Sequence, residues 1–176
     1  MRFNSPSMFR IAFAAAWVAL LLTSCDSSLE PPEAVGAGAL RVTITYAGDW
    51  PPEDSLEIAG FAALTFVPQD IQEVVDFAAP AILNPGSDVQ EVPFAQVEEG
   101  ASQQTLLIEN VRATTYLYSG VAGFFGGNFI NGDNWELLGV YEEGDGTFTV
   151  VPDDTVDIAL TVDFDNPPPF PPPAAN

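Results

Sequence analysis

The 176-residue chain has 25 acidic residues, four basic residues and no histidine, which gives a formal charge of −21 at pH 7. Such an acidic surface repels phosphates and argues against nucleic acid or an anionic lipid surface as a partner. Because the chain has one cysteine and neither histidine nor lysine, a Ser-His-Asp triad, a histidine-ligated metal and a Schiff-base lysine are all excluded.

The first 24 residues have the organisation of an export signal. Arg2 and Arg10 supply a positive region, and the apolar run at 11–22 is too short to cross a bilayer. The run ends in Leu-Thr-Ser-Cys (22–25), which resembles the lipobox of bacterial lipoprotein signals. The resemblance implies cleavage after residue 24 and diacylation of the thiol of Cys25. An ordinary secretory signal and a buried anchor helix are the alternatives.

Removal of residues 1–24 makes the chain more acidic. All 25 carboxylates follow Cys25, and Arg41 and Arg112 are the remaining basic residues, so the mature charge is 2 − 25 = −23. The hydrophobic fraction of 47% is too high for a disordered acidic segment. Dense carboxylates around a well-filled core favour a halophilic protein, whose self-repulsion is screened by salt. An acidic surface without salt adaptation is the alternative.

The mature length fits one domain between two extended ends. Residues 25–38 are expected to form a lipidated, flexible tether, and residues 39–165 a β-sandwich domain. Residues 166–176 contain six prolines, which predicts a disordered, extended tail. A docked Pro-rich peptide is the alternative for that tail.

A period of two dominates the predicted domain. Every second residue is apolar in 40–46 and again in 156–164, as in strands with one buried face. Further strands are predicted from β-branched and aromatic residues at 56–67, 103–110, 114–125, 135–141 and 147–151. The expected fold is therefore all-β: a single antiparallel, Ig-like sandwich of about seven strands.

One segment between the strands has helical spacing. Ile71, Val74, Val75 and Ala78 predict a short helix near 70–79, with Asp70 as N-cap and a proline at position 80 as its stop. The two valines could equally belong to a strand. The structure of the long insertion 68–102 is otherwise left open.

Five stretches of the domain together resemble a known family. Residues 40–46 with Trp-Pro-Pro (50–52), the strand end Ala-Leu-Thr-Phe-Val-Pro (63–68), and the segments 135–141 and 156–164 resemble prealbumin-like domains. These are also described as transthyretin-like or carboxypeptidase-regulatory-type, and they occur in uncharacterised bacterial lipoproteins. The resemblance implies a seven-stranded sandwich with a structural, adhesive or accessory role.

Carboxylates are the remaining candidates for catalysis, and their pattern argues against an enzyme. The adjacent pairs at 98–99, 142–143 and 153–154 lie in or beside expected turns, and neighbouring strand residues point to opposite faces. The Asp-Thr at 154–155 lacks the glycine that follows this dipeptide in aspartic proteases. We therefore predict a non-catalytic protein without a required cofactor.

A calcium site is one candidate binding function. Two Gly-rich loops that flank one predicted strand contain oxygen ligands at Asn131, Asp133, Glu136, Glu142, Glu143 and Asp145. Calcium prefers six to eight oxygen ligands, although neither loop has EF-hand spacing. The alternative is a set of solvated acidic turns.

Aromatic residues suggest carbohydrate as a second candidate ligand. Trp50 lies in a predicted loop, Phe125 precedes a Gly-Gly-Asn turn, and Trp135 follows Asn134. Exposed rings at the rim of a sandwich can stack on sugars. The alternative is that these rings belong to the core, as most sandwich aromatics do.

These features predict a lipid-anchored protein of the cell envelope with a structural or accessory binding role. The membrane would be contacted through the N-terminal lipid, and the partner would be an envelope protein or a glycan. Asp26, directly after the cysteine, resembles an inner-membrane retention signal in some bacteria and accompanies surface export in others. The outer membrane is favoured here.

Overall fold

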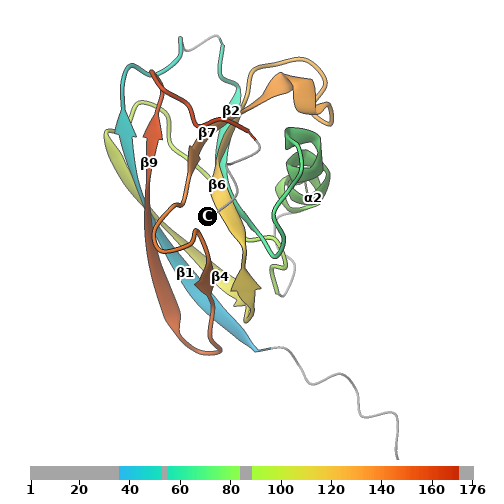
Figure 1. The fold of residues 1–176 in the computed structure, drawn as a ribbon, viewed down its shortest axis with the longest axis vertical. Helices are drawn as coiled ribbons and strands as arrows, with labels where there is room; N and C mark the ends of the chain where they lie inside the picture. Colours follow the sequence, from blue (N-terminus) through green and yellow to red (C-terminus); the bar gives the residue numbers. More distant parts are fainter. Residues whose placement is uncertain (1–35, 53–54, 84–88, 171–176) are drawn as a thin grey trace, which may run out of the picture. The chain divides into compact units, whose positions relative to one another are not determined.

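The computed structural model describes residues 36–52, 55–83 and 89–170, which belong to one compact unit and are mainly β-strand (Figure 1). The strands are β1 (Ala37–Ala47), β2 (Ile58–Leu64), β3 (Phe94–Gln96), β4 (Gln103–Arg112), β5 (Thr115–Tyr116), β6 (Tyr118–Phe124), β7 (Trp135–Val140), β8 (Phe148–Thr149) and β9 (Thr155–Asp163). The helices are α2 (Ile71–Leu83) and the 3₁₀ helix η1 (Gly132–Asn134). The export signal and the predicted lipidation site, Cys25, lie outside the described residues.

The first larger sheet has the strand order β4-β1-β9. Its central strand fulfils the predicted alternation, because Leu40, Val42 and Ile44 are fully buried while Arg41 and Thr45 are exposed. β1 pairs with β4 in antiparallel register but with β9 in parallel register. The expectation of a wholly antiparallel fold is therefore wrong at this pair. Alternation reports which face of a strand is buried and carries no information about the direction of its neighbour.

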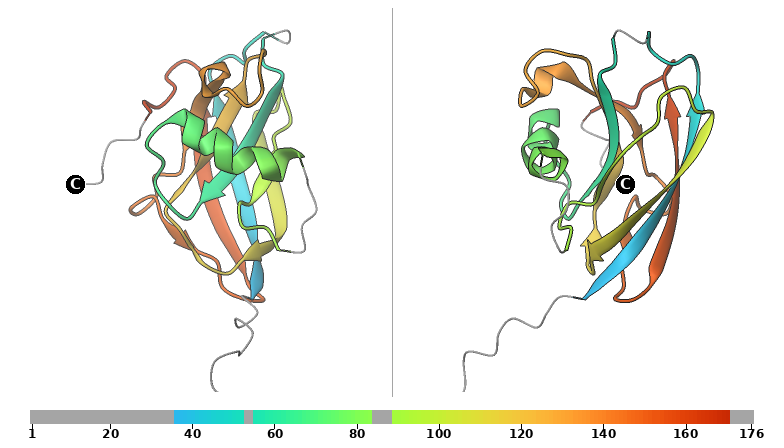
Figure 2. Two further views of the ribbon diagram at one scale, coloured as in Figure 1. Left: turned by 90° about the vertical axis from the view of Figure 1, so that its right-hand side faces the viewer. Right: turned by 180° about the vertical axis from the view of Figure 1, so that it is seen from behind.

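The second larger sheet has the order β3-β2-β6-β7, and its strand pairs are antiparallel. Both of its faces are covered. Phe61 and Val121 point into the space between the sheets, and α2 packs on the outer face (Figure 2). This explains why β2 and β6 are apolar almost throughout instead of alternating, as strands buried on both faces are.

The segment 114–125, predicted as one strand, forms two. β5 pairs with β8 in a separate two-stranded sheet, whereas β6 joins the four-stranded sheet. The break falls at Leu117, which is exposed and whose backbone N–H donates to the carbonyl of Leu64 at 2.9 Å.

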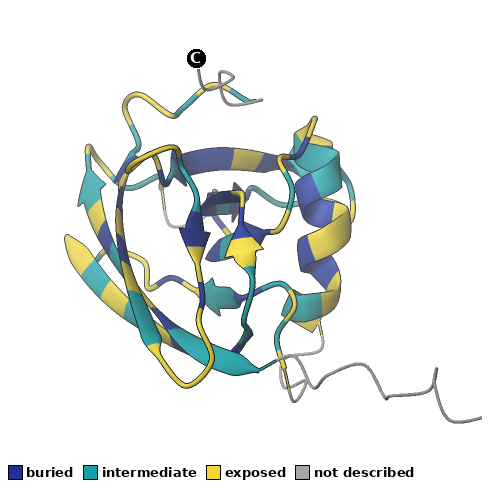
Figure 3. Cartoon of the chain, turned by 60° about the horizontal axis from the view of Figure 1, so that its bottom comes forward, coloured by how far each residue is buried: buried dark blue, intermediate teal, exposed yellow. Residues whose placement is uncertain are grey.

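The predicted helix is present and is longer than expected. Asp70 caps it as predicted, since its Oδ1 accepts from the backbone N–H of Glu73 at 2.9 Å. The expected stop at Pro80 is wrong, because the proline lies inside the helix, which continues to Leu83. Pro80 and Asp76, whose carbonyl loses its i+4 donor, are both exposed, so water can satisfy that carbonyl. Buried and exposed residues alternate along α2 (Figure 3).

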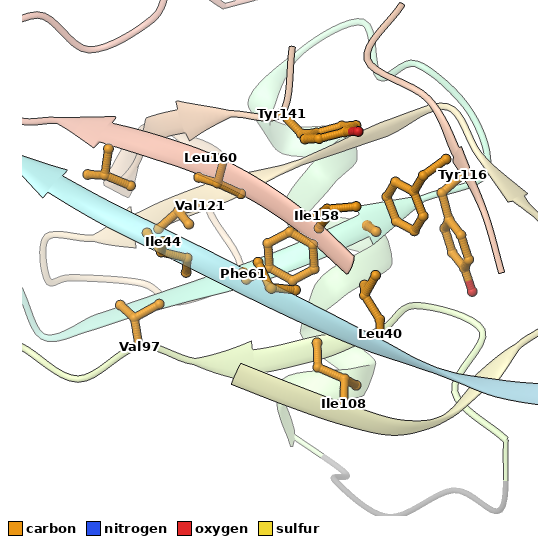
Figure 4. Close-up of a cluster of buried hydrophobic side chains, with 14 of the residues drawn as sticks. Leu40, Ile44, Phe61, Val97, Ile108, Tyr116, Val121, Tyr141, Ile158 and Leu160 are labelled. Carbon is orange, nitrogen blue, oxygen red and sulfur yellow. The ribbon is translucent and has the colours of Figure 1, made fainter. Parts of the chain in front are cut away.

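The main core lies between the two larger sheets (Figure 4). Each layer contributes fully or almost fully buried side chains, including Leu40, Phe61, Ile108, Val121 and Ile158. Two smaller clusters lie between the four-stranded sheet and α2. The described residues therefore form three main layers: the sheet β4-β1-β9, the sheet β3-β2-β6-β7 and the helix α2.

The chain beyond β9 remains in contact with the fold. The sequence predicts a disordered tail at 166–176, but the structure describes it as far as Phe170, which is half-buried against Leu64, Val74, Tyr118 and Leu137. Residues 171–176 lie outside the described residues. Within the part of the chain that the structure describes, none of the helices is long and apolar enough to cross a bilayer.

Candidate functional site

Two of the predicted calcium ligands accept hydrogen bonds within their own turns. Asn131 Oδ1 accepts from the backbone N–H of Asp133 at 3.2 Å and caps η1. Asp145 Oδ1 accepts from Thr147, from the hydroxyl at 2.6 Å and from the backbone N–H at 3.2 Å. These bonds lower the pKa of the Asp145 carboxyl. Asn131 and Asp145 therefore stabilise the turns in which they lie.

The remaining predicted ligands are acidic residues at the surface. Glu136, Glu142 and Glu143 are exposed, as are Asp133 and Asp145. Among the residues that the structure describes, no three Asp, Glu, His or Cys side chains gather closely enough to hold a metal ion.

Trp50 closes one end of the main core. Its ring centroid lies 4.6 Å from that of Tyr46 and 4.6 Å from that of Phe164. Its indole Nε1 donates to the carbonyl of Ala101 at 3.0 Å. The ring is half-buried, and these contacts hold it in one orientation.

Trp135 and Phe125 are placed in two different clusters. Trp135 is 8% exposed, packs against Phe124 and Phe129, and donates from Nε1 to the carbonyl of Phe129 at 2.8 Å. Phe125 is half-buried against the main core, as is Trp50. The structure therefore does not bring the three predicted sugar-stacking rings together in one cluster.

A cavity for which the sequence gives no prediction lies between α2 and the outer face of the four-stranded sheet. Its volume is about 30 Å³, and apolar side chains of the helix, including Val74, Val75 and Ala78, form its roof. Tyr118, Trp135 and Leu137 form part of its wall. A cavity of this volume holds one or two water-sized molecules.

Tyr118 is the polar side chain in the wall of this cavity. It is 5% exposed, and its hydroxyl has no hydrogen-bond partner among the described residues. Burial raises the pKa of the Tyr118 hydroxyl far above its ordinary value, so the group keeps its proton and remains a donor. An unpaired buried hydroxyl costs about 1–3 kcal/mol. Ser119, the next residue, also has a buried hydroxyl with no partner in the part of the chain that the structure describes.

A groove beside the cavity is closed by the C-terminal segment. It has a volume of about 360 Å³ and is lined on one side by Ile71, Trp135 and Leu137 and on the other by Pro168 and Phe170. Trp135 and Leu137 belong to the walls of both the groove and the cavity. The ring of Phe170 lies edge-on to that of Tyr118, with 6.1 Å between centroids.

Sequence reasoning missed this region, although the sequence contains a signal for it. Residues 58–64 and 118–124 combine strand-forming residues with glycine and alanine at alternate positions. Small residues on one face of a strand allow another element to approach closely. The pattern thus indicates that a second layer packs on these strands. The burial of the Tyr118 hydroxyl could not be predicted, because it depends on residues distant in the sequence.

Comparisons of the chain with protein-family models, curated proteins and solved structures gave no match.

Proposed function

We propose that the chain is a non-catalytic lipoprotein of the bacterial cell envelope, held at the outer membrane by lipid on Cys25. The observation that carries this proposal is the order of features at the N-terminus. Two arginines, a short apolar run and Leu-Thr-Ser-Cys (22–25) follow one another at the spacing of a lipoprotein signal. The folded unit begins soon afterwards, at residue 36.

The fold proposed for this unit is a prealbumin-like sandwich. Two features support it: two larger sheets enclose one core, and the strands that carry the sequence resemblance, β1, β2, β7 and β9, contribute to both sheets. The helix α2, inserted between β2 and β3, is an addition to a seven-stranded sandwich. Such a domain would serve a structural or accessory role through its loops and outer layers.

The absence of catalysis is proposed from the residue types and from the position of the carboxylates. The chain has no histidine or lysine to act as a base or nucleophile. The acidic pairs at 98–99, 142–143 and 153–154 are exposed in or beside turns. Paired catalytic carboxylates instead need a shared site in which their pKa values are driven apart.

Lipidation can be tested directly in a bacterial host. We expect the full chain to incorporate a palmitate analogue, and mass spectrometry to find a diacylated N-terminus at residue 25 without residues 1–24. The variant Cys25→Ser removes the thiol that accepts the lipid, so it should incorporate no label and should leave the membrane fraction.

Ser24→Ala is the matched control, because it keeps a small residue before the cysteine and should be processed normally. Retention of Met1 in the membrane-bound protein, or membrane binding by Cys25→Ser equal to that of the native chain, would contradict the proposal.

A further inference from the structure

The two larger sheets have four edge strands, and three of them are short or covered. β3 has three residues. β7 and β9 lie against each other, because a Cβ added at Gly139 would come within 2.6 Å of the carbonyl oxygen of Thr161. β4 has ten residues, and among the residues that the structure describes its one paired strand is β1. An exposed edge of this kind is a template for pairing with another chain.

β1 shows which backbone groups of the first sheet are paired. The N–H of Tyr46 donates to the carbonyl of Ser102, next to β4, at 3.0 Å. The N–H of Ala39 and the carbonyl of Ala47 instead bond to residues that flank β9, at 2.8 and 3.0 Å. Because backbone groups point to alternate sides along a strand, the even-numbered residues of β1 from 40 to 46 face β4.

The backbone of β4 has the same alternation. In the register, its even-numbered residues from 104 to 108 lie opposite the even-numbered residues of β1 and exchange hydrogen bonds with them. The N–H and C=O groups of Gln103, Thr105 and Leu107 therefore point away from the sheet, and they have no partner in the described part of the chain. The carbonyl of Glu109, the next residue in this series, accepts from Gln90 Nε2 at 3.1 Å, in agreement with this direction.

One end of this edge is blocked, and the remainder is uncharged. At the C-terminal end, Asn110 has a φ of 57°, and the backbone of Gln90 pairs with Asn110 and Arg112. Residues 101–108 contain neither a charged residue nor a proline, although the chain has 25 acidic residues and 16 prolines. Proteins usually protect open strand edges with charges, prolines or bulges. The open stretch 103–107 is therefore suited to pairing with an extended segment.

The charges around the open edge favour a cationic partner. Glu98 and Glu99 are exposed before β4, and Glu109 is exposed near its end, so carboxylates lie at both ends of the uncharged stretch. Within that stretch, Leu107 is 56% exposed. Residues 25–176 have a formal charge of −23, so a second copy of the chain is repelled, whereas a basic segment is attracted.

From this geometry we propose that β4 binds an extended segment of a basic partner protein, which adds a fourth strand to the sheet β4-β1-β9. The segment is about seven residues long, with a cationic side chain near each end and uncharged, β-branched residues between them. Its main chain pairs with Gln103, Thr105 and Leu107. This inference rests on the accessory binding role proposed above, and it specifies the chemistry of the partner.

The test titrates two synthetic peptides with blocked ends into the purified full chain by calorimetry. Their sequences are Lys-Thr-Val-Thr-Val-Thr-Lys and Glu-Thr-Val-Thr-Val-Thr-Glu, so they differ in charge and share the same strand-forming core. We expect the lysine peptide to bind in roughly 0.1 M NaCl and to bind about 3- to 10-fold more weakly in roughly 1 M NaCl. The glutamate peptide should not bind. Cys25→Ser should bind the lysine peptide as the native chain does, so this binding can fail independently of the lipid anchor.

Hydrogen exchange followed by NMR locates the bound peptide. The amide protons of Gln103, Thr105 and Leu107 should exchange several-fold more slowly in the complex, because they gain carbonyl partners. Those of Gln104 and Leu106, which already pair with β1, should change little. A peptide that lies on the outer face of the sheet without strand pairing would not produce this alternation.

A substitution at the centre of the edge tests the main-chain pairing. Thr105→Pro removes an outward N–H without removing a bond to β1, and proline is tolerated on edge strands. It should weaken binding of the lysine peptide about 10-fold or more, because one acceptor of the peptide loses its donor. Thr105→Ser keeps the N–H and is the matched control. A thermal melt shows whether Thr105→Pro folds, and the exchange pattern of the native chain tests the proposal independently of that variant.

Four outcomes would overturn the proposal. The first is that the lysine peptide does not bind the native chain, and the second is that the glutamate peptide binds equally well. The third is that the protection from exchange does not alternate along β4. The fourth is that the alternating protection is present without peptide and sedimentation finds a dimer, because the edge would then be occupied by a second copy of the chain.

Discussion

At the scale of single residues, the burial of tyrosine hydroxyls makes the stability of the fold depend on pH. Tyr116 is fully buried, and its hydroxyl donates to the carbonyl of Arg112 at 3.3 Å. Burial raises the pKa of Tyr116 to about 12, and it also raises the pKa of Tyr46 to about 12. The proton is therefore held more tightly in the folded state than in the unfolded chain, where tyrosine titrates at about 10.

This difference predicts a loss of stability in alkali. Below pH 10 the contribution of Tyr116 to the free energy of unfolding is fully present, because both states are protonated. As the pH rises from about 10 to about 12, the unfolded chain loses its proton first and stability falls, by up to roughly 3 kcal/mol for this residue. Urea denaturation at a series of pH values measures the fall.

Tyr116→Phe is the matched control for this prediction. It keeps the ring that stacks on Phe148 and removes the group that ionises. The variant should lose less stability than the native chain between pH 10 and 12. Identical pH profiles for the two proteins would contradict the assignment to Tyr116.

At the scale of elements, α2 contains a position at which a substitution should stabilise the fold. Pro80 lies within the helix on its exposed side and supplies no N–H to the carbonyl of Asp76. Pro80→Ala restores that donor and should raise the free energy of unfolding by about 1–2 kcal/mol, after the greater entropy of the unfolded alanine chain is subtracted. Urea denaturation followed by circular dichroism gives the value.

Pro80→Gly separates the two contributions. It restores the same N–H but adds backbone freedom, so it should stabilise the helix less than alanine does. If both variants are less stable than the native chain, the proline ring itself stabilises the end of the helix, and the argument from the missing donor is wrong.

The elements also show what could be predicted from the sequence and why. In β1 and β9 the polar face is exposed, so alternation located both strands. In β2 and β6 both faces are buried. Small residues such as Ala62 and Ala122 indicate that another layer packs on these strands, but they do not show which element forms that layer. The parallel direction of β9 and the continuation of α2 past Pro80 depend on tertiary packing, which a period in the sequence does not report.

For the candidate sites too, the sequence shows the residue types, whereas their contacts depend on the fold. The oxygen-rich residues Asn131 and Asp145 were recognisable by type, but their bonds to neighbouring backbone N–H groups required the folded turns. The cavity beneath α2 is lined by residues of four strands and one helix, which are distant from one another in the sequence. Its one polar group, on Tyr118, becomes distinctive only when the burial of its hydroxyl is known.

At the scale of the whole molecule, charge governs stability. Residues 25–176 have a formal charge of −23, and their two arginines, Arg41 and Arg112, form exposed ion pairs that contribute about 0–1 kcal/mol each. Repulsion among the other carboxylates destabilises the folded state and is screened by salt. We expect the melting temperature to rise by about 5 °C or more between roughly 0.1 and 2 M NaCl, measured by calorimetry.

A charge-reduced variant separates screening from a general effect of the solute. Glu98, Glu99, Glu142 and Glu143 are exposed, and their joint replacement by glutamine should reduce the salt dependence. Sucrose, which carries no charge, should affect both proteins equally. A melting temperature of the native chain that is independent of salt would remove the case for a salt-adapted protein.

The parallel pairing of β1 and β9 has a mechanical consequence. The chain enters the folded unit where β1 begins and leaves the sheet where β9 ends, and the two strands run in the same direction (Figure 1). A pull between these points loads the hydrogen bonds from the pair Ala39–Thr155 to the pair Ala47–Asp163 in shear, so that they share the force instead of opening one at a time. Under tension we therefore expect Phe170 to detach first, and the paired strands to resist until they slide past each other together.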